Sequence, residues 1–202
     1  MKRSQKVRDL YALATISGSG WFCDDPDEIK DKYYKPCALI SQASYQSEKP
    51  SEIDGYKLVE STEDRSTYEK DDQIIVGFRG TSNLRDVAHD VLILFDSLDS
   101  SERFRGDLDY VKHLTTQYSN VIVCGHSLGG SIAYLIAEKL KLNAYCFNPA
   151  FPPKKLSMIK KVSDKIRVFR IRGDPVSAYA QDYAKVIYVC ASGWNLHGIK
   201  NF

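Results

Sequence analysis

The sequence predicts a three-layer α/β fold in which an antiparallel set of strands precedes a mostly parallel central sheet. Three short segments with strand composition and charged turns between them come first: YKLVES (56–61), RSTYEK (65–70) and QIIVGF (73–78). Apolar strands then alternate with stretches of helical periodicity, which is typical of a parallel sheet with helical crossovers. The length of 202 residues predicts one compact domain spanning 1–202, with little or no cap domain.

The elements before the parallel part follow from local patterns. Residues 1 to about 16 have helical spacing and precede the breaker Ser17-Gly18-Ser19-Gly20, so we expect a terminal helix on the outside of the domain. The stretch 24–35 carries both charge signs and is expected to be solvated. The run 74–76 is apolar without alternation, which suits a strand covered on both faces.

The second half predicts helices and strands in alternation. Apolar stripes predict helices over 104–118 and 132–140. Strands are expected at 121–124, 143–147, 165–172 and 185–190.

Composition excludes several classes of protein. Twenty-eight Lys and Arg against 26 Asp and Glu leave a net charge of +2, which gives no case for a nucleic-acid binder. Charges at Lys6, Arg8 and Asp9 interrupt the N-terminal apolar run, so we expect neither a signal peptide nor a membrane span.

The five cysteines predict neither a disulfide framework nor a zinc site. They are odd in number, far apart and without a C-x-x-C pair: Cys23, Cys37, Cys124, Cys146 and Cys190. We therefore expect a reducing, intracellular setting, and no metal or organic cofactor.

A candidate nucleophile lies between a predicted strand and a predicted helix. The segment Gly125-His126-Ser127-Leu128-Gly129-Gly130 contains G-x-S-x-G. A serine at a sharp strand-to-helix turn needs glycines two residues before and after it, because a Cβ there would collide with the turn. The first helical N–H groups, including that of Leu128, then point at charge developing on a bound carbonyl.

The order of residues along the chain selects the partners of Ser127. In proteins with this strand-turn-helix arrangement, an acid and then a histidine follow the serine later in the sequence. Only His197 follows it, since His89 and His113 precede it and His126 is its neighbour. Among the acids, Asp174 follows a predicted strand between Gly173 and Pro175, where a carboxylate can orient an imidazole. Asp182 is the alternative, whereas Glu138 and Asp164 are expected in a helix and before a strand.

Three motifs in this order resemble the class 3 lipase family of the α/β-hydrolase superfamily. They are Phe78-Arg79-Gly80-Thr81, the Gly125–Gly130 segment, and Gly173-Asp174-Pro175-Val176 with His197 downstream. The resemblance covers about residues 56–202. It implies an α/β-hydrolase fold and hydrolysis of lipid or small esters by a Ser-Asp-His triad through an acyl-enzyme. It also implies that Thr81 and Leu128 form the oxyanion hole, and that Asp90 holds the Thr81 side chain.

The chain departs from the family pattern in two places. Phe104-Arg105-Gly106-Asp107 stands where these lipases usually have His-x-Gly-Phe, so one wall of the acyl pocket is expected to differ. The apolar run 91–95 is either a buried segment or an exposed flap that contacts lipid.

Alternatives to a lipase or esterase stay open at this point. From Lys154 to Arg172 there are eight basic residues and one acid, a local charge of +7. We expect mostly a solvated face, although Lys154 and Lys155 would also suit transient contact with an anionic lipid surface. That contact would favour phospholipase A1-type activity. A catalytically silent hydrolase-fold module that binds lipid or protein is the other alternative.

Overall fold

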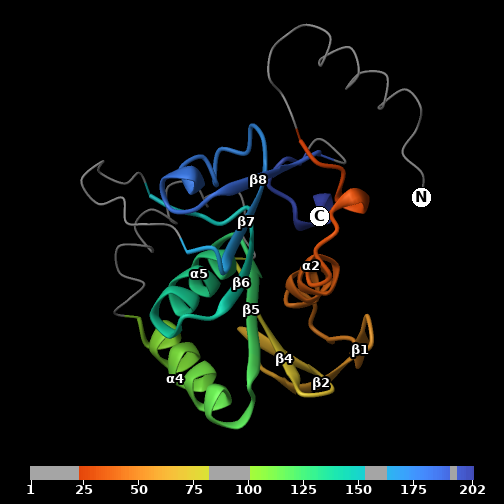
Figure 1. Cartoon of the computed structure of the whole chain (residues 1–202), viewed down its shortest axis with the longest axis vertical. Coiled ribbons are helices and arrows are strands. Elements are labelled where there is room, and N and C mark those ends of the chain that lie inside the picture. The colour runs from red at the N-terminus through yellow and green to blue at the C-terminus, as the bar shows by residue number, and fades with distance from the viewer. Residues whose placement is uncertain (1–22, 82–100, 153–162, 192–194) are drawn as a thin grey trace, which may run out of the picture.

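Eight strands of the described residues form one sheet in which the strand order follows the sequence (Figure 1). The computed structural model describes residues 23–81, 101–152, 163–191 and 195–202. The strands are β1 (Glu52–Ile53), β2 (Tyr56–Ser61), β3 (Arg65–Lys70), β4 (Gln73–Phe78), β5 (Asn120–His126), β6 (Asn143–Phe147), β7 (Ile166–Ile171) and β8 (Val186–Val189). Strands β1 to β4 pair antiparallel, and β4 to β8 pair parallel, which confirms the predicted architecture.

Helices cover both faces of this sheet. Three α-helices lie in the described residues: α2 (Tyr34–Ala43), α4 (Glu102–Gln117) and α5 (Leu128–Leu140). Short 3-10 helices occur at Pro26–Glu28 (η1), Ala180–Asp182 (η3) and Ile199–Asn201 (η4). Figure 1 shows α4 and α5 on one side of the sheet and α2 on the other.

The central strands place alternate side chains in two separate cores. Val121 and Val123 of β5 face the core that α4 and α5 cover, whereas Ile122 and Cys124 face the core that α2 covers. Ile75 of β4 likewise faces α2, and its two neighbours face the other side. The apolar run of β4 is therefore covered on both faces, as its sequence predicts.

Helix α2 is the described α-helix that the sequence analysis missed. It begins at the end of the charged stretch expected to be solvated, and it is short with a proline in its first turn. Its buried residues Tyr34, Cys37, Ala38 and Ser41 have the spacing of one helical face, which is the signal that could have revealed it. A Cβ at Gly77 of β4 would lie 2.6 Å from Ile40 Cγ2, so this glycine allows α2 to lie close to the sheet.

A disulfide between Cys23 and Cys190 corrects the expectation that no cysteines pair. The chain before η1 lies beside β8, where Asp24 and Val189 form a parallel bridge. The two cysteines are 167 residues apart, so only the edge of the folded sheet brings them together. The intracellular setting stays a prediction, without the cysteine pattern as its support. Cys37, Cys124 and Cys146 are free and buried.

Some predicted features lie outside the described residues. They are the terminal helix over residues 1–16 and the apolar run 91–95. No helix in the described ranges is both long and apolar enough to cross a membrane.

Opening the Cys23–Cys190 disulfide should lower the free energy of unfolding, because this cross-link restricts the unfolded chain. The chain-entropy model sets an upper limit of about 5 kcal/mol for a loop of this length. Reductant should lower the melting temperature of the unmodified chain and leave that of a Cys23→Ser, Cys190→Ser double variant unchanged. In denaturant, three of the five thiols should react before reduction. Five reactive thiols at that stage would contradict the pairing.

Candidate active site

The turn between β5 and α5 holds Ser127 in a backbone conformation that few residues adopt. Its φ of 57° and ψ of −127° lie outside the helical and extended regions, and the side chain is buried. Glycines permit this turn, because a Cβ at Gly125 would collide with the backbone of Gly129. The sequence context of strand, turn and helix is therefore present around the predicted nucleophile.

The end of β4 lies against the same turn. A Cβ at Gly129 would meet the backbone of Phe78. A Cβ at Gly80 would lie 2.6 Å from the His126 carbonyl oxygen and 3.3 Å from Ser127 Cβ. Thr81 directly follows this contact and is half-buried, and Leu128 is the first residue of α5. The two predicted oxyanion residues thus belong to backbone segments that flank Ser127.

Asp174 and His197 form the predicted acid–histidine pair. His197 Nδ1 lies 3.0 Å from Asp174 Oδ2, and both residues are buried. Asp174 follows β7 through Gly173, whose φ of +87° favours glycine. The alternative acid, Asp182, lies in η3, and none of the hydrogen bonds described for His197 involves it.

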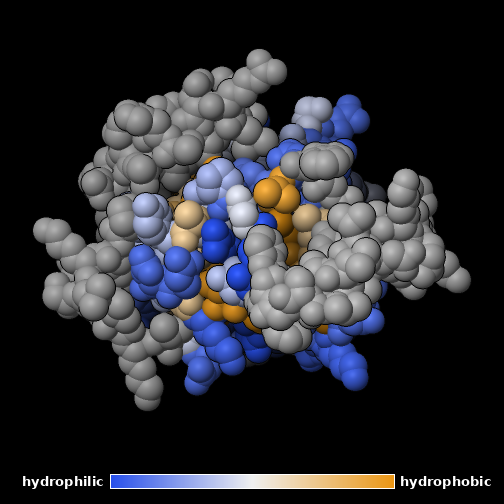
Figure 2. Space-filling model, turned by 90° about the horizontal axis from the view of Figure 1, so that it is seen from above, coloured by the Kyte–Doolittle hydropathy of each residue, from blue (hydrophilic) through white to orange (hydrophobic). Residues whose placement is uncertain are grey.

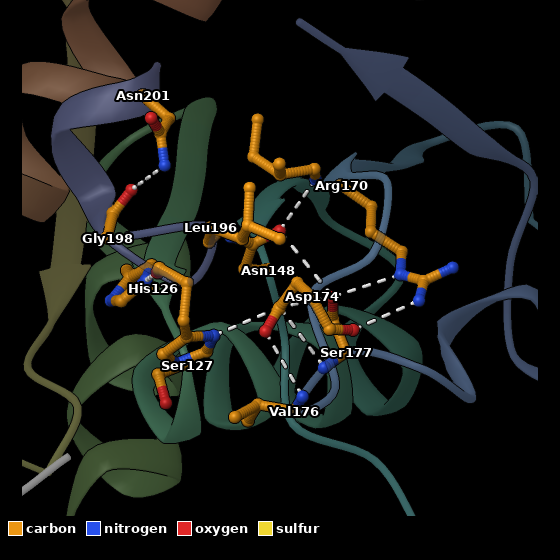
Figure 3. A network of polar contacts seen from close by, with 12 residues as sticks. His126, Ser127, Asn148, Arg170, Asp174, Val176, Ser177, Leu196, Gly198 and Asn201 are labelled. Atoms are coloured by element: carbon orange, nitrogen blue, oxygen red, sulfur yellow. Dashed lines mark hydrogen bonds and ion pairs between the residues drawn. The ribbon is translucent and has the colours of Figure 1, made fainter. Parts of the chain in front are cut away.

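Several donors keep the Asp174 carboxylate ionised. Its oxygens accept hydrogen bonds from Ser177 Oγ at 2.5 Å and from the backbone N–H groups of Val176 and Ser177 at 3.1 and 3.2 Å (Figure 3). Burial by itself raises the pKa of Asp174, but the hydrogen bond and charge of His197, with these donors, outweigh burial and lower the pKa below its ordinary value.

The Asp174 loop is also held by a half-buried arginine. Arg170 Nε donates to Ser177 Oγ, and its Nη2 donates to the Asp174 carbonyl, both at 3.1 Å. Arg170 belongs to the basic segment that was expected to be mostly a solvated face. Arg167 pairs with Asp31 at 2.7 Å, so described arginines of this segment have internal partners. Lys154 and Lys155 lie outside the described residues.

Asn148 ties the His197 loop to two strand ends, and the sequence analysis did not single it out. Its Nδ2 donates to the Leu196 carbonyl at 3.0 Å, and its Oδ1 accepts from Ile171 N at 2.8 Å. Asn148 follows β6 at the carboxyl edge of the sheet and has a φ of 41°. An asparagine directly after a buried parallel strand is the signal that could have pointed to it.

Two atoms of the site lack hydrogen-bond partners within the part of the chain that the structure describes. They are Ser127 Oγ and His197 Nε2, both buried. The ring of His197 lies 4.7 Å from that of His126, centroid to centroid, and His126 is the residue before Ser127. A buried hydroxyl and a buried imidazole nitrogen are thus held in one neighbourhood, and the imidazole is oriented by a carboxylate. Such an arrangement can activate a hydroxyl as a nucleophile.

The other candidate residues lie elsewhere in the fold or outside the described residues. Glu138 lies on α5, Asp164 precedes β7, and His113 is exposed on α4. Asp90 and His89 lie outside the described residues. In the ranges that the structure describes, no three His, Cys, Asp or Glu side chains gather as they would around a metal ion.

The segment Phe104–Asp107, where the sequence departs from the family pattern, belongs to helix α4. This helix helps to hold β4 in place. Asp107 is buried and its Oδ1 lies 3.1 Å from Arg65 Nη1. Burial raises the pKa of Asp107, with Arg103 and Arg65 opposing this effect. Arg103 also donates to the Arg79 carbonyl at 2.5 Å, so α4 holds the strand end that leads to Thr81.

The face of the molecule seen from above mixes apolar and polar residues. Figure 2 shows hydrophobic side chains near the centre of the face seen from above, among hydrophilic ones. A cavity of about 480 Å³ lies elsewhere, where β4 and β5 begin, and its lining includes Tyr33, Gln73 and Asn120. The chemistry-bearing residues lie at the opposite, carboxyl edge of these strands.

Ser177→Ala should change the dependence of stability on pH. The lowered pKa of Asp174 stabilises the fold above the unfolded carboxyl pKa of about 3.9, and this stabilisation is lost as pH falls through the folded pKa. Without the Ser177 donor the folded pKa rises. The variant should therefore lose about 1 to 2 kcal/mol near neutral pH, and the deficit should shrink as pH falls below the unfolded carboxyl pKa.

Urea unfolding across pH measures this effect. Ser119→Ala is the matched control, because Ser119 Oγ donates to Asp72 at 2.9 Å on the surface. That variant should change stability little. A deficit for Ser177→Ala that is constant across pH would contradict the role of its hydroxyl.

Comparisons with known proteins found a matching family model and structures of similar fold. Residues 102–150 match the family model described as Lipase (class 3). A mutant form of MDLA from Penicillium cyclopium is 17% identical, with a TM-score of 0.53, and the match covers 83% of this chain and 80% of that one. A lipase from Rhizopus microsporus var. chinensis is 20% identical, with a TM-score of 0.50, and the match covers 67% of this chain and 64% of that one. No curated protein sequence matches the chain.

The two matched structures have the same fold as this chain. The family model matches the segment that contains α4, β5, the Ser127 turn and α5. The architecture is the α/β-hydrolase fold, as the sequence predicts. The chain therefore resembles the class 3 lipases in residues 102–150 and shares its fold with the two matched structures.

Proposed function

We propose that this protein hydrolyses carboxylic esters of lipids as a serine hydrolase, with Ser127 as the nucleophile. The family match supports lipid-ester hydrolysis. The observation that carries the finer proposal is the hydrogen bond between buried Asp174 and His197 beside the Ser127 turn, with Ser127 Oγ and His197 Nε2 both left without described partners.

Acylation begins at Ser127. Its Oγ attacks the ester carbonyl carbon as His197 Nε2 takes the hydroxyl proton. The ionised Asp174 accepts the hydrogen bond from His197 Nδ1, so it holds the tautomer that leaves Nε2 free and stabilises the imidazolium that forms. The lowered pKa of Asp174 means that this carboxylate carries its charge at neutral pH.

The oxyanion forms between the two backbone segments that flank Ser127. We assign its donors to the N–H of Leu128 at the start of α5 and to the N–H and hydroxyl of Thr81. The close packing at Gly80 supports this assignment, because it keeps the end of β4 against the nucleophile turn. Asp90 is proposed to hold the Thr81 hydroxyl.

Collapse of the tetrahedral intermediate releases the alcohol, which receives the proton from His197. Water then attacks the acyl-enzyme as His197 takes a proton from it, and a second intermediate collapses to the carboxylic acid and free Ser127. These steps need no group besides the protein and water.

Ser127→Ala should lower ester turnover by at least about 1,000-fold, because the remaining binding and oxyanion contacts supply only a residual acceleration. It should also abolish covalent labelling by a fluorophosphonate probe. Ser131→Ala is the matched control, since Ser131 is a buried serine one turn along α5 whose Oγ donates to the Ala150 carbonyl at 2.6 Å. That variant should keep its label.

Wild-type protein that is folded but neither labelled nor active would refute the proposal. It would instead favour a silent module that binds lipid or protein.

Substrate class is measured with p-nitrophenyl esters of increasing acyl length, emulsified triglyceride and phospholipid vesicles. We expect turnover of p-nitrophenyl esters and of triglyceride, because the proposed chemistry acts on the ester group and the match is to a lipase family. Rates that fall steeply beyond short acyl chains would restrict the protein to an esterase. Hydrolysis confined to vesicles with anionic lipid, and lost at high salt, would favour the phospholipase A1-type alternative.

A further inference from the structure

We propose that His126 and Tyr45 are positioning residues that hold the backbone of His197 in register with Ser127. This inference rests on the proposed function, in which His197 is the base. The two residues touch neither the substrate nor the reacting atoms in the proposed steps. They act through the main chain of His197.

The contacts form a chain from helix α2 to the His197 loop. The hydroxyl of Tyr45, which follows the end of α2, lies 2.9 Å from His126 Nδ1. His126 Nε2 lies 2.5 Å from the His197 carbonyl oxygen. The His126 side chain is buried, and its ring contacts the rings of both Tyr45 and His197.

These partners allow one protonation state of His126. A carbonyl oxygen only accepts hydrogen bonds, so His126 Nε2 carries the proton. Nδ1 then accepts a hydrogen bond from the Tyr45 hydroxyl. Burial, with the nearby His197, lowers the pKa of His126 to about 3, so the ring stays neutral in the range where the proposed base operates.

The contact between His126 and the His197 carbonyl places the proposed nucleophile and the proposed base relative to each other. His126 and Ser127 are consecutive, so one turn carries both the hydroxyl and the group that binds the His197 main chain. Asn148 Nδ2 holds the preceding carbonyl, that of Leu196. Two consecutive carbonyls of the histidine loop are therefore anchored to residues at the ends of β5 and β6. Asp174 then has only the ring orientation to determine.

Tyr45 also contacts the end of β4. A Cβ at Gly80 would collide with the Tyr45 hydroxyl, so the phenol packs directly against the segment that leads to Thr81. Burial raises the pKa of Tyr45 above its ordinary value, so its O–H remains a donor. The Tyr45 hydroxyl thus contacts the strand end that precedes Thr81, a proposed oxyanion donor. It also contacts the ring of His126, which holds the main chain of the proposed base.

Three substitutions of His126 separate hydrogen bonding from packing. The amide nitrogen of His126→Gln can reach the place of imidazole Nε2 and donate to the His197 carbonyl. His126→Asn places its amide near Nδ1, where it meets Tyr45 but does not reach His197. His126→Leu fills the space without polar atoms. Kinetics with a p-nitrophenyl ester and the rate of fluorophosphonate labelling are measured on the full chain.

We expect His126→Leu and His126→Asn to lower kcat by about 10- to 100-fold, the loss that a misplaced catalytic group produces. KM should stay within about threefold, because ground-state binding does not use this contact. The labelling rate should fall in parallel with kcat. His126→Gln should recover most of the lost kcat.

Tyr45→Phe should lower kcat in the same direction, because it removes the hydroxyl that donates to His126 Nδ1 and holds the ring in place. Tyr68→Phe is its matched control. Tyr68 is a buried residue of β3, and its hydroxyl donates to the Pro50 carbonyl at 3.0 Å. That variant should keep kcat. Melting temperatures and near-UV circular dichroism identify variants that lose their fold, and kinetics are compared among the folded ones.

The outcomes separate this inference from the proposed function. Unlabelled, inactive wild-type protein would overturn both. Active wild-type protein with a folded His126→Leu variant of equal kcat would overturn the positioning role alone. Equal losses in the folded Gln and Leu variants would also overturn it, because packing would then explain the effect without the hydrogen bond.

Discussion

The structure of the site depends on how closely the end of β4 and the β5–α5 turn approach each other. Ser127 adopts a positive φ, and Gly80, Gly125 and Gly129 leave no side chains where backbones meet. This contact requires strands β4 and β5 to be parallel neighbours with fixed register, which the apolar side chains on both faces of β5 maintain. In the proposed mechanism, this close approach lets backbone N–H groups face the charge that develops on the substrate's carbonyl oxygen beside Ser127.

Polar side chains at the carboxyl edge then hold loops that have no sheet partners of their own. Asn148, His126 and Arg170 each bind a backbone carbonyl of a loop that carries a member of the proposed triad. Buried polar groups need such partners, since an unpaired one costs free energy comparable to a lost hydrogen bond. The same bonds that satisfy these side chains therefore fix the places of Asp174 and His197.

Two buried ionisable groups of the site have opposite charge states, although burial disfavours charge on both. Burial disfavours charge on both His126 and Asp174, and His126, without a carboxylate partner in contact, remains neutral. Asp174 stays ionised because His197, Ser177 and the N–H of Val176 donate to it. The protein thus keeps a neutral histidine for holding the backbone and a charged carboxylate for orienting the second histidine, within one small volume. The hydrogen-bond donors around each group, more than the depth of burial, decide the difference.

The sequence by itself determined the features that local pattern encodes. Strands 56–61, 65–70, 73–78 and 143–147 have the predicted bounds, and the Ser127 turn lies between strand and helix, because alternation, apolar runs and glycine spacing act over a few residues. Chain order also selected Asp174 and His197, whose catalytic roles stay predictions. Only the tertiary structure decided the Cys23–Cys190 disulfide, the packing of α2 on the sheet, and the Tyr45–His126–His197 contacts. These join segments far apart in the chain, and their partners are set by the closure of the sheet and not by spacing.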